Sequence, residues 1–516
     1  GRVTVPAFRA PFVDKVLSES RALGYTRDEA TRALLKAVKT VEDSEFELPD
    51  TLQGTLRGYQ RTGFRWLRTM EHFGFGGILA DDMGLGKTVQ MITLLLDAKK
   101  RGVTLPSLVV CPASLVLNWQ SEIRRFAPSL PVRAIVGDSA AREALLQDLE
   151  PGTVLITSYD LLKRDAALYA DLSFHYHVLD EAQYIKNHAT QNARTVKGIR
   201  SVQRFALTGT PVENRLSELW SIFDFLMPGF LFSYPRFRER FELPAVRDGD
   251  REALAALARL CAPFLLRRLK KDVLQELPPK TETVRCIPLE ETQRKTYLAA
   301  ALRMREELQS RTAEGPTRLQ ALTMLTRLRQ ICCDPTLCYD NYRGGSAKLE
   351  NCLELVKEAV EGGHRVLLFS QFTSMLAILE TRLREAGIDF YTLQGSTPRE
   401  KRAAMVEEFN SEGGAPVFLI SLKAGGTGLN LTAADVVIHY DPWWNVSVQN
   451  QAADRAHRIG QQRPVQVFKL IAEGTVEEKI LRLQEAKQSL ADAVVRADGL
   501  SLSALSDEEI LVLLMP

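Results

Sequence analysis

The chain has 516 residues, which is too long for one hydrophobic core, so we expect at least two large domains. Its hydrophobic content of 45% and charged content of 25% are ordinary for a globular protein, and its formal net charge of +2 excludes a strongly basic surface over the whole molecule. Any nucleic-acid contact must therefore come from local patches. The sequence shows neither a long apolar run nor a secretory leader, so we expect no membrane partner.

The N-terminal residues 1–49 combine helical periodicity with charged faces and end in a linker, so we expect a helical appendage. Because the first residue is Gly rather than Met, we expect a fragment or a processed chain. The seven cysteines lack the paired spacing of a zinc site, and we expect reduced, mostly buried thiols.

Residues 56–67 (LRGYQRTGFRWL) predict a helix with an apolar face. Gln60 lies on this helix, and its amide can both donate to and accept from the edge of an adenine ring. Taken alone, Gln60 is more typical of a surface amide than of a nucleotide ligand.

Residues 77–90 (GILADDMGLGKTVQ) predict a buried strand, a glycine-bearing turn and a helix that begins near Lys87, which is the layout of a phosphate-binding loop. Its glycines let backbone N–H groups point at phosphate oxygens, and the helix N-terminus adds partial positive charge. Lys87 can reach the β- and γ-phosphates, and the Thr88 hydroxyl can hold Mg²⁺. The strict pattern has Gly where this chain has Asp81, and a plain turn is the alternative. The predicted nucleotide-binding residues of the loop are Asp82, Met83, Gly84, Leu85, Gly86, Lys87 and Thr88.

Short apolar runs alternate with helical segments through the rest of the first half. The runs are residues 108–110, 153–157, 177–179 and 205–207. This alternation predicts a parallel sheet with helices on both faces, in which ligands bind at the carboxyl ends of the strands.

Asp180 and Glu181 follow one of these runs. A carboxylate at a strand end, across from Thr88, can hold Mg²⁺ directly or through water, and the next carboxylate can orient and deprotonate an attacking water. Two solvated acids in a turn are the alternative interpretation.

Residues 213–262 are helical in pattern and rich in aromatic residues, which we interpret as an inserted helical subdomain rather than a base-stacking surface. Residues 264–271 (FLLRRLKK) then predict a basic patch of Arg267, Arg268, Lys270 and Lys271, either at a solvated helix end or coupling two domains. Residues 277–280 (LPPK) mark a domain boundary. The predicted domains are 1–49, 50–276, 277–490 and a helical tail at 491–516.

The second half repeats the α/β pattern, with a helical insertion at about 290–345 and no phosphate loop of its own. Strands are expected at 283–287, 365–370, 388–393, 417–421 and 436–439. An expected helix over 447–458 places Gln451, Arg455 and Arg458 at i, i+4 and i+7, on one face. Such arginines can stabilise a transferred γ-phosphate, although a solvated basic stripe has the same spacing. The fold class predicted is α/β, with two parallel-sheet lobes that ATP would draw together.

Four motifs together resemble the Swi/Snf-type ATPases of helicase superfamily two. They are LADDMGLGKT (79–88), DEAQ (180–183), LTGTPVEN (207–214) and QAADRAHRIGQ (451–461). The resemblance covers about 50–490 and implies two RecA-like lobes and ATP-driven tracking along duplex DNA without unwinding. Gln183 stands where many eukaryotic members have His, which favours the bacterial and archaeal branch.

The resemblance also implies roles for single residues. Gln60 would bind adenine, Lys87 and Thr88 would bind phosphate and Mg²⁺, Asp180 would hold the metal and Glu181 would be the general base. Gln451, Arg455 and Arg458 would sense and stabilise the γ-phosphate. The residues implied along the DNA backbone are Pro112, Ser114, Leu115 and Thr157 from the first lobe, and Ser370, Gln371, Gly395, Ser396, Lys423, Gly426 and Thr427 from the second. Hydroxyl and backbone N–H groups suit contacts that ignore base sequence, with steep salt dependence.

We therefore expect ATP and Mg²⁺ as cofactors, double-stranded DNA as the partner, and a monomeric DNA-stimulated ATPase that remodels protein–DNA complexes. It would be cytoplasmic and nucleoid-associated in a prokaryote, or nuclear in a eukaryote. Three alternatives stay open: an ATPase that binds and recycles RNA polymerase, a nucleotide-gated DNA-binding scaffold with little turnover, and a strand-separating helicase.

Overall fold

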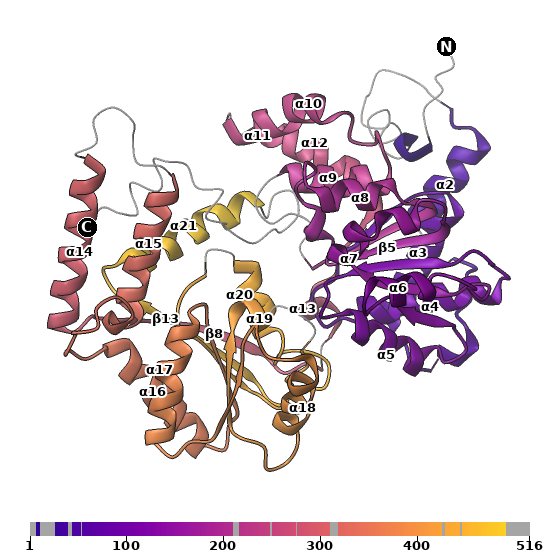
Figure 1. Cartoon of the computed structure of the whole chain (residues 1–516). Helices are drawn as coiled ribbons and strands as arrows, with labels where there is room; N and C mark the ends of the chain where they lie inside the picture. Colours follow the sequence, from indigo (N-terminus) through magenta and orange to yellow (C-terminus); the bar gives the residue numbers. More distant parts are fainter. Residues whose placement is uncertain are drawn as a thin grey trace. The chain divides into compact units, whose positions relative to one another are not determined.

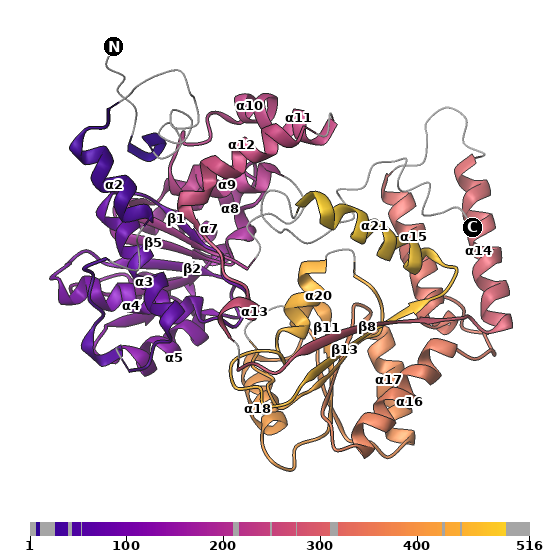
Figure 2. The same ribbon diagram turned by 180° about the vertical axis from the view of Figure 1, so that it is seen from behind.

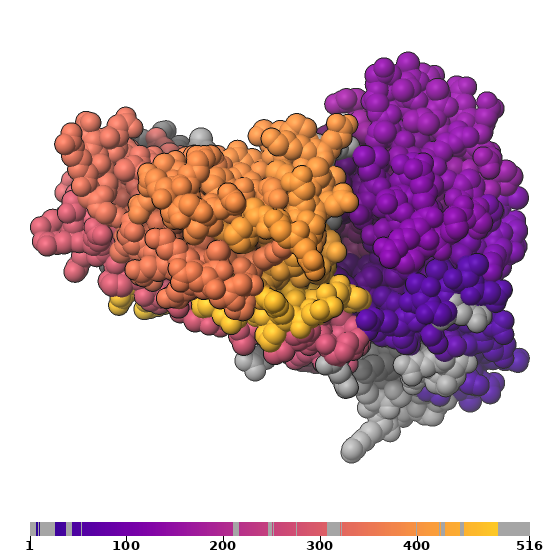
Figure 3. All heavy atoms as spheres, turned by 90° about the horizontal axis from the view of Figure 1, so that it is seen from below, coloured from indigo at the N-terminus to yellow at the C-terminus, as the bar shows by residue number. Residues whose placement is uncertain are grey.

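The computed structural model describes residues 7–10, 26–39, 44–52, 54–209, 216–247, 250–274, 276–309, 318–425, 429–443 and 446–491. They form two compact units, one up to residue 275 and one over residues 276–490 (Figure 1). Figure 3 shows one face of the surface that the heavy atoms of the two units form. Among the described helices, none is both long and apolar enough to cross a membrane.

The first unit is built on a parallel sheet, which has seven strands among the described residues, in the order β3-β4-β2-β5-β6-β1-β7. The strands are β1 (Gly77–Leu79), β2 (Ser107–Cys111), β3 (Val132–Ala134), β4 (Val154–Ser158), β5 (Ser173–Asp180), β6 (Arg200–Leu207) and β7 (Leu265–Leu266). Every residue of β1, β2 and β4 is buried, as expected for a parallel sheet that is covered on both faces.

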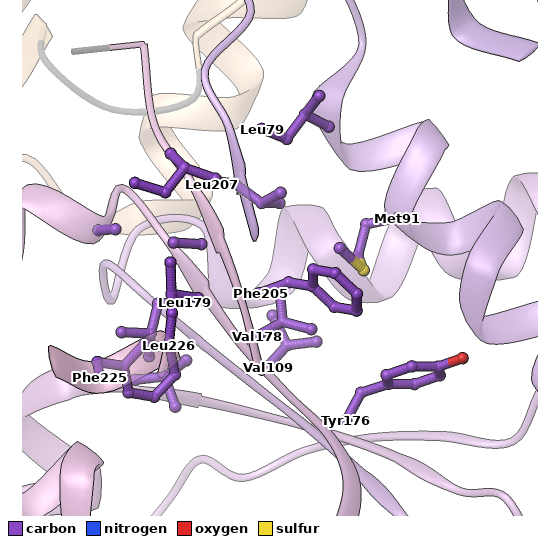
Figure 4. Packing of buried hydrophobic residues seen from close by; sticks show 14 of the residues in the cluster. Leu79, Met91, Val109, Tyr176, Val178, Leu179, Phe205, Leu207, Phe225 and Leu226 are labelled. Carbon is purple, nitrogen blue, oxygen red and sulfur yellow. The ribbon is translucent and has the colours of Figure 1, made fainter. Parts of the chain in front are cut away.

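Helices cover this sheet and connect its strands. They are α2 (Glu29–Lys39), α3 (Gly58–His72), α4 (Lys87–Lys100), α5 (Val116–Phe126), α6 (Ser139–Leu145), α7 (Tyr159–Arg164), α8 (Gln191–Gly198) and α9 (Leu216–Leu226). Side chains of β5 alternate between the two faces of the sheet. The Tyr176 hydroxyl accepts a hydrogen bond from Arg101, which follows α4, whereas His177 lies edge-on to Phe225 of α9. Figure 4 shows Met91 of α4 beside Phe205, and Phe225 beside Leu179.

The aromatic-rich segment continues from α9 as a run of short helices. They are α10 (Tyr234–Phe237), π-helical η6 (Arg238–Glu242), α11 (Leu243–Arg247) and α12 (Arg251–Cys261). Phe223, Phe230 and Phe237 are fully buried and belong to the same hydrophobic core as the sheet. These rings therefore pack the interior and are not available to stack on bases.

The second unit is also built on a parallel sheet, in the order β10-β11-β9-β12-β13-β8 over the part that the structure describes. Its strands are β8 (Lys280–Ile287), β9 (Val366–Ser370), β10 (Phe390–Leu393), β11 (Val417–Ser421), β12 (Val436–His439) and β13 (Val465–Ala472). One face packs on α16 (Ala347–Glu361) and α17 (Thr373–Glu385). The other face packs on α18 (Arg399–Asn410), α19 (Leu422–Gly425) and α20 (Val446–Ala453).

A separate hydrophobic cluster joins three further helices of this unit, which are α14 (Glu291–Gln309), α15 (Arg318–Cys333) and α21 (Val476–Ala491). Figure 2 shows α21 beside α15, in agreement with the packing of Val476 and Ile480 against Leu325 and Leu328. The seven cysteines all lie in described segments as free thiols, and five of them are buried.

The predicted α/β class with two parallel-sheet lobes is confirmed, and each predicted strand is present within a few residues of its expected bounds. Three strands were not predicted. β3 and β7 have only three and two residues, too few to show a period of two. β13 has eight residues and was missed although its apolar content is high.

Two buried histidines lie near the centres of the sheets. His177 of β5 and His439 of β12 are 0% and 1% exposed, and within the described part of the chain neither imidazole has a hydrogen-bond partner. His439 stacks on Phe369 at 5.6 Å between ring centroids. Burial lowers the pKa of both from 6.5 to about 3, so each ring stays neutral and packs as an aromatic group.

Replacing His177 with Phe should make the protein less sensitive to acid. Between pH 6.5 and 3 the unfolded imidazole binds a proton that the native one does not, so stability is lost as pH falls below about 6.5, by up to ~1.4 kcal/mol per pH unit. The loss in thermal midpoint from pH 7.5 to 5.5 should shrink by roughly 3–5 °C. His72→Phe replaces an exposed ring and is the control; equal pH profiles for both variants would contradict the expectation.

Candidate nucleotide site

The turn between β1 and α4 has the backbone conformation that a phosphate-binding loop requires. Gly84 and Gly86 have φ angles of 89° and 79°, in the left-handed region where glycine is the least strained residue. Gly86 is the residue before α4, which begins at Lys87 as predicted. The N-terminus of a 14-residue helix therefore faces the turn and favours an anion there.

Lys87 and Thr88 lie half-buried in the first turn of α4. The Lys87 Nζ donates to the carbonyl oxygen of Asp81 at 2.6 Å and lies 3.4 Å from that of Asp82. These carbonyls are neutral acceptors, whereas a phosphate would offer a charge-assisted bond to the same ammonium group. The predicted loop residues 82–88 thus lie together at one helix N-terminus.

Gln60 of α3 is buried against this loop, which excludes the surface amide as an alternative. Its Nε2 donates to the carbonyl oxygen of Leu85 at 3.0 Å, and its Oε1 accepts from the backbone N–H of Arg57 at 2.9 Å. A Cβ atom at Gly86 would lie 2.5 Å from Gln60 Nε2. Glycine at position 86 is therefore needed for Gln60 to approach the loop.

Asp81, which replaces the glycine of the strict pattern, is fully buried and forms an ion pair with Arg268. Arg268 donates from Nε to Oδ1 at 2.8 Å and from Nη2 to Oδ2 at 2.5 Å, and Gln90 of α4 donates to Oδ2 at 3.1 Å. Arg268 also donates to the carbonyl oxygen of Tyr59. The pair therefore joins α3, the phosphate loop, α4 and the segment after β7.

The predicted basic patch is wrong for Arg268 and Lys270. Strand β7 pairs with β1, so the chain that follows it runs along the base of the phosphate loop and both side chains are largely buried there. The backbone N–H of Lys270 donates to Asp82 Oδ2 at 3.0 Å. A Cβ at Gly63 would lie 1.8 Å from Gln90 Oε1 and 2.8 Å from Arg268 Nη2, so a glycine in α3 leaves room for this network.

Asp180 and Glu181 stand at the carboxyl end of β5. Asp180 Oδ1 accepts from the backbone N–H of Glu181 at 2.9 Å, and Oδ2 accepts from the indole Nε1 of Trp119 at 2.8 Å. Glu181 has a left-handed φ of 51°, which is strained for a residue with a side chain and is typical of functional sites. Its Oε2 accepts from Gln183, whose Oε1 accepts from Thr208 at the end of β6.

Burial, with the charge of Glu181 added, raises the pKa of Asp180 to about 7. The Trp119 hydrogen bond and the charge of Lys87 oppose this shift, so Lys87 and Asp180 act on each other electrostatically. Asp180 is buried and Glu181 is half-buried, so the two acids are not a solvated pair in a turn. They lie at the same sheet edge as the phosphate loop. A cation bound there would favour the ionised form of Asp180.

The oxygen ligands at this edge suit Mg²⁺. No group of three His, Cys, Asp or Glu residues that could hold a metal occurs in the part of the chain that the structure describes. Mg²⁺ is commonly held by one or two protein oxygens with water and phosphate completing the shell, and the Asp180 carboxylate and Thr88 hydroxyl fit that role.

The predicted helix over 447–458 is wrong in its second half, because α20 ends at Ala453. The carbonyl oxygen of Arg455 accepts from the backbone N–H of Leu431 at 3.1 Å, which draws the chain out of the helix. Arg455 and Arg458 nevertheless converge, since Nη1 of each donates to the carbonyl oxygen of Leu429, at 3.5 and 3.1 Å. Arg455 is buried, so the arginines are not a solvated stripe either. Gln451 is half-buried on α20.

Of the DNA contacts expected from the first lobe, only Ser114 has a partly exposed side chain. Pro112, Leu115 and Thr157 are buried at the carboxyl ends of β2 and β4. Any contact from these three positions would have to involve the backbone.

The expected contacts of the second lobe differ in exposure. Gly395 and Ser396 are exposed, whereas Ser370 is fully buried and its Oγ donates to Asp441 at 2.6 Å. Gln371 accepts from Arg329 of α15 at 3.0 Å, and Arg329 Nη2 lies 3.7 Å from Asp441. Lys423 lies on α19, and Gly426 and Thr427 lie outside the described residues.

Three residues that contact the predicted site were not found from the sequence. Trp119, Arg268 and Arg329 bond to Asp180, Asp81 and Gln371, each from a segment far along the chain. Only Arg268 gave any signal, as a member of the basic run, and that signal was misinterpreted.

Two family models match the chain. Residues 59–337 match the SNF2-related domain and residues 347–460 match the helicase conserved C-terminal domain. An uncharacterized ATP-dependent helicase of Mycoplasma pneumoniae is 40% identical over 483 residues, covering 92% of this chain and 46% of that protein. The human SWI/SNF-related matrix-associated actin-dependent regulator of chromatin subfamily A member 1 is 39% identical over 478 residues, covering 89% and 46%. The chain thus spans about half the length of these relatives.

Among solved structures, the Sulfolobus solfataricus SWI2/SNF2 ATPase core in complex with double-stranded DNA is similar to this chain. It is 36% identical in sequence, with a TM-score of 0.45, and the match covers 88% of this chain and all of that one.

Replacing Arg268 with Met should destabilise the first unit by ~3–5 kcal/mol, because it leaves the buried Asp81 carboxylate without its cation. Arg200→Met is the matched control, since its ion pair with Asp171 is exposed and should contribute at most ~1 kcal/mol. Thermal unfolding followed by calorimetry measures both. Similar losses of stability in the two variants would show that the buried ion pair contributes no more than the exposed one.

Proposed function

This chain belongs to the SNF2-related family, and from that premise we propose that it hydrolyses ATP to move along double-stranded DNA and remodel protein–DNA complexes without separating the strands. The observation that carries the proposal is the shared sheet edge on which the phosphate loop and the Asp180–Glu181 pair lie. The matches to the SNF2-related and helicase C-terminal domains support the nature of the motor.

In this proposal the first unit binds the nucleotide. Gln60 exchanges its bond to Leu85 for the edge of adenine, and the backbone N–H groups of residues 82–86 with Lys87 bind the phosphates. Lys87 leaves the carbonyl oxygens of Asp81 and Asp82, which are weaker acceptors than phosphate. Thr88 and Asp180 would hold Mg²⁺, which would neutralise charge on the phosphate oxygens.

Glu181 then accepts a proton from the attacking water. Its hydrogen bond from Gln183 fixes the carboxylate, and its backbone has a left-handed φ of 51°. Gln451, Arg455 and Arg458 stabilise the charge on the γ-phosphate. The shared bond of both arginines to Leu429 supports this role, because it holds two guanidinium groups side by side before any phosphate arrives.

DNA contact comes from the loops that follow the strands of both units. Ser114, Gly395 and Ser396 have the exposure that contact with a phosphate backbone requires. Lys423, Gly426 and Thr427 are further contacts in this proposal, and Pro112, Leu115, Thr157, Ser370 and Gln371 shape the loops that carry the contacts. Uncharged groups and backbone N–H donors of this kind bind any base sequence.

ATP hydrolysis should be strongly stimulated by linear duplex DNA and much less by single strands. The stimulation should fall steeply between two salt concentrations, because phosphate contacts release counterions. A forked duplex assayed in parallel should remain paired. Equal stimulation by single strands would contradict the proposal. No stimulation despite ATP binding would point to a protein activator such as RNA polymerase.

Replacing Glu181 with Gln should lower the hydrolysis rate by ~10²–10⁴-fold, because the amide cannot accept the proton, while ATP still binds. Glu150→Gln changes an exposed acid before β4 and should leave the rate unchanged. Phosphate release and binding of a fluorescent ATP analogue measure the two effects separately. An unaltered rate in Glu181→Gln would instead favour a nucleotide-gated scaffold.

A further inference from the structure

Two aromatic residues hold Asp180, and each comes from a segment that the proposed function places along the DNA backbone. Trp119 of α5 donates from its indole Nε1 to Asp180 Oδ2 at 2.8 Å. Tyr159, the first residue of α7, donates its hydroxyl to the backbone carbonyl oxygen of Asp180 at 2.9 Å. Both side chains are buried, so neither can turn away into solvent.

Trp119 is rigidly joined to the 112–115 segment. The backbone N–H of Trp119 donates to the carbonyl oxygen of Leu115 at 2.9 Å, and that of Leu115 donates to Pro112 at 2.8 Å. Leu115 is the residue before α5, so Trp119 lies one helical turn beyond the segment. A displacement of residues 112–115 therefore moves the indole that holds Asp180.

Tyr159 gives a second and independent connection. It directly follows Thr157 and Ser158 at the end of β4, where the Ser158 Oγ accepts from the backbone N–H of Leu161 and caps α7. Its ring stacks on Tyr184, with 5.0 Å between centroids and 8° between planes. Tyr184 belongs to the 3-10 helix η5 (Ala182–Ile185), which follows Glu181. Tyr159 thus contacts the residues on both sides of the catalytic carboxylate.

We infer that Trp119 and Tyr159 are positioning residues through which contact with DNA sets the orientation of the Asp180 carboxylate and hence the affinity for Mg²⁺. The inference rests on the proposed function, because the metal and DNA contacts are assigned there. With Oδ1 bonded to the Glu181 N–H and Oδ2 to Trp119, the rotation of the carboxylate is fixed by these two donors. Partners of this kind commonly change metal affinity by 10- to 100-fold.

Two conservative substitutions separate this role from core packing. Trp119→Phe removes the N–H donor and keeps an aromatic ring, and Tyr159→Phe removes only the hydroxyl. Trp220→Phe and Tyr297→Phe are matched controls. Trp220 is buried and donates to the backbone of Phe232, and the buried Tyr297 hydroxyl accepts from the backbone of Val476, so neither touches Asp180.

The measurement is the Mg²⁺ concentration that gives half-maximal binding of a fluorescent ATP analogue, with and without linear duplex DNA. In the wild type the duplex should lower this concentration. Trp119→Phe should raise it by about tenfold and abolish the effect of the duplex, and Tyr159→Phe should shift it in the same direction. Binding of the analogue in EDTA should be unchanged, which a general loss of folding would not allow.

The outcomes are distinct. If both variants match Trp220→Phe and Tyr297→Phe while the wild type responds to duplex, the positioning role of Trp119 and Tyr159 is overturned and the proposed function stands. If Trp119→Phe does not fold, Tyr159→Phe decides alone by the same shift. If the wild type neither binds the analogue nor hydrolyses ATP, the proposed function fails, and the positioning role fails with it.

Discussion

Three carboxylates are buried at the carboxyl ends of parallel strands in the described part of the chain. Each needs hydrogen bonds or a cation, and this need determines which side chains surround these strand ends. Asp81 follows β1, Asp180 ends β5 and Asp441 follows β12. A buried carboxylate is very costly unless hydrogen bonds or a cation surround it. Each carboxylate has a hydrogen-bond or ion-pair partner from another element. The partners are Arg268 for Asp81, Trp119 for Asp180, and Ser370 with Arg329 for Asp441.

Two of these partners lie in or next to the helical insertions. Arg268 lies just beyond the helices α9 to α12, on the segment that returns to the sheet at β7. Arg329 lies on α15, within the helical region of the second unit, and reaches both Asp441 and Gln371 at the end of β9. In each unit, then, a residue of an inserted helix, or of the segment that follows the inserted helices, is bonded to the carboxyl ends of the strands.

The sequence was sufficient for the elements whose pattern is local. The phosphate loop, the start of α4 at Lys87 and the strands before the DEAQ motif follow from short apolar runs, glycines and their spacing. The partner of Asp81 could not be found in this way, because Arg268 is 187 residues away and no local pattern records the pairing. The end of α20 was missed for the same reason, since the bond between Leu431 and Arg455 joins distant segments.

The placement of Arg268 has a mechanical consequence. The chain leaves the first unit through α13 (Lys270–Val273), which follows Arg268, the partner of Asp81, and whose first residue is bonded to Asp82. Tension on the connecting segment would be resisted first by the ion pair of Arg268 and by the Lys270 N–H, both of which end on the phosphate loop. A load on this connector would therefore act on the phosphate loop before it acts on the rest of the first sheet.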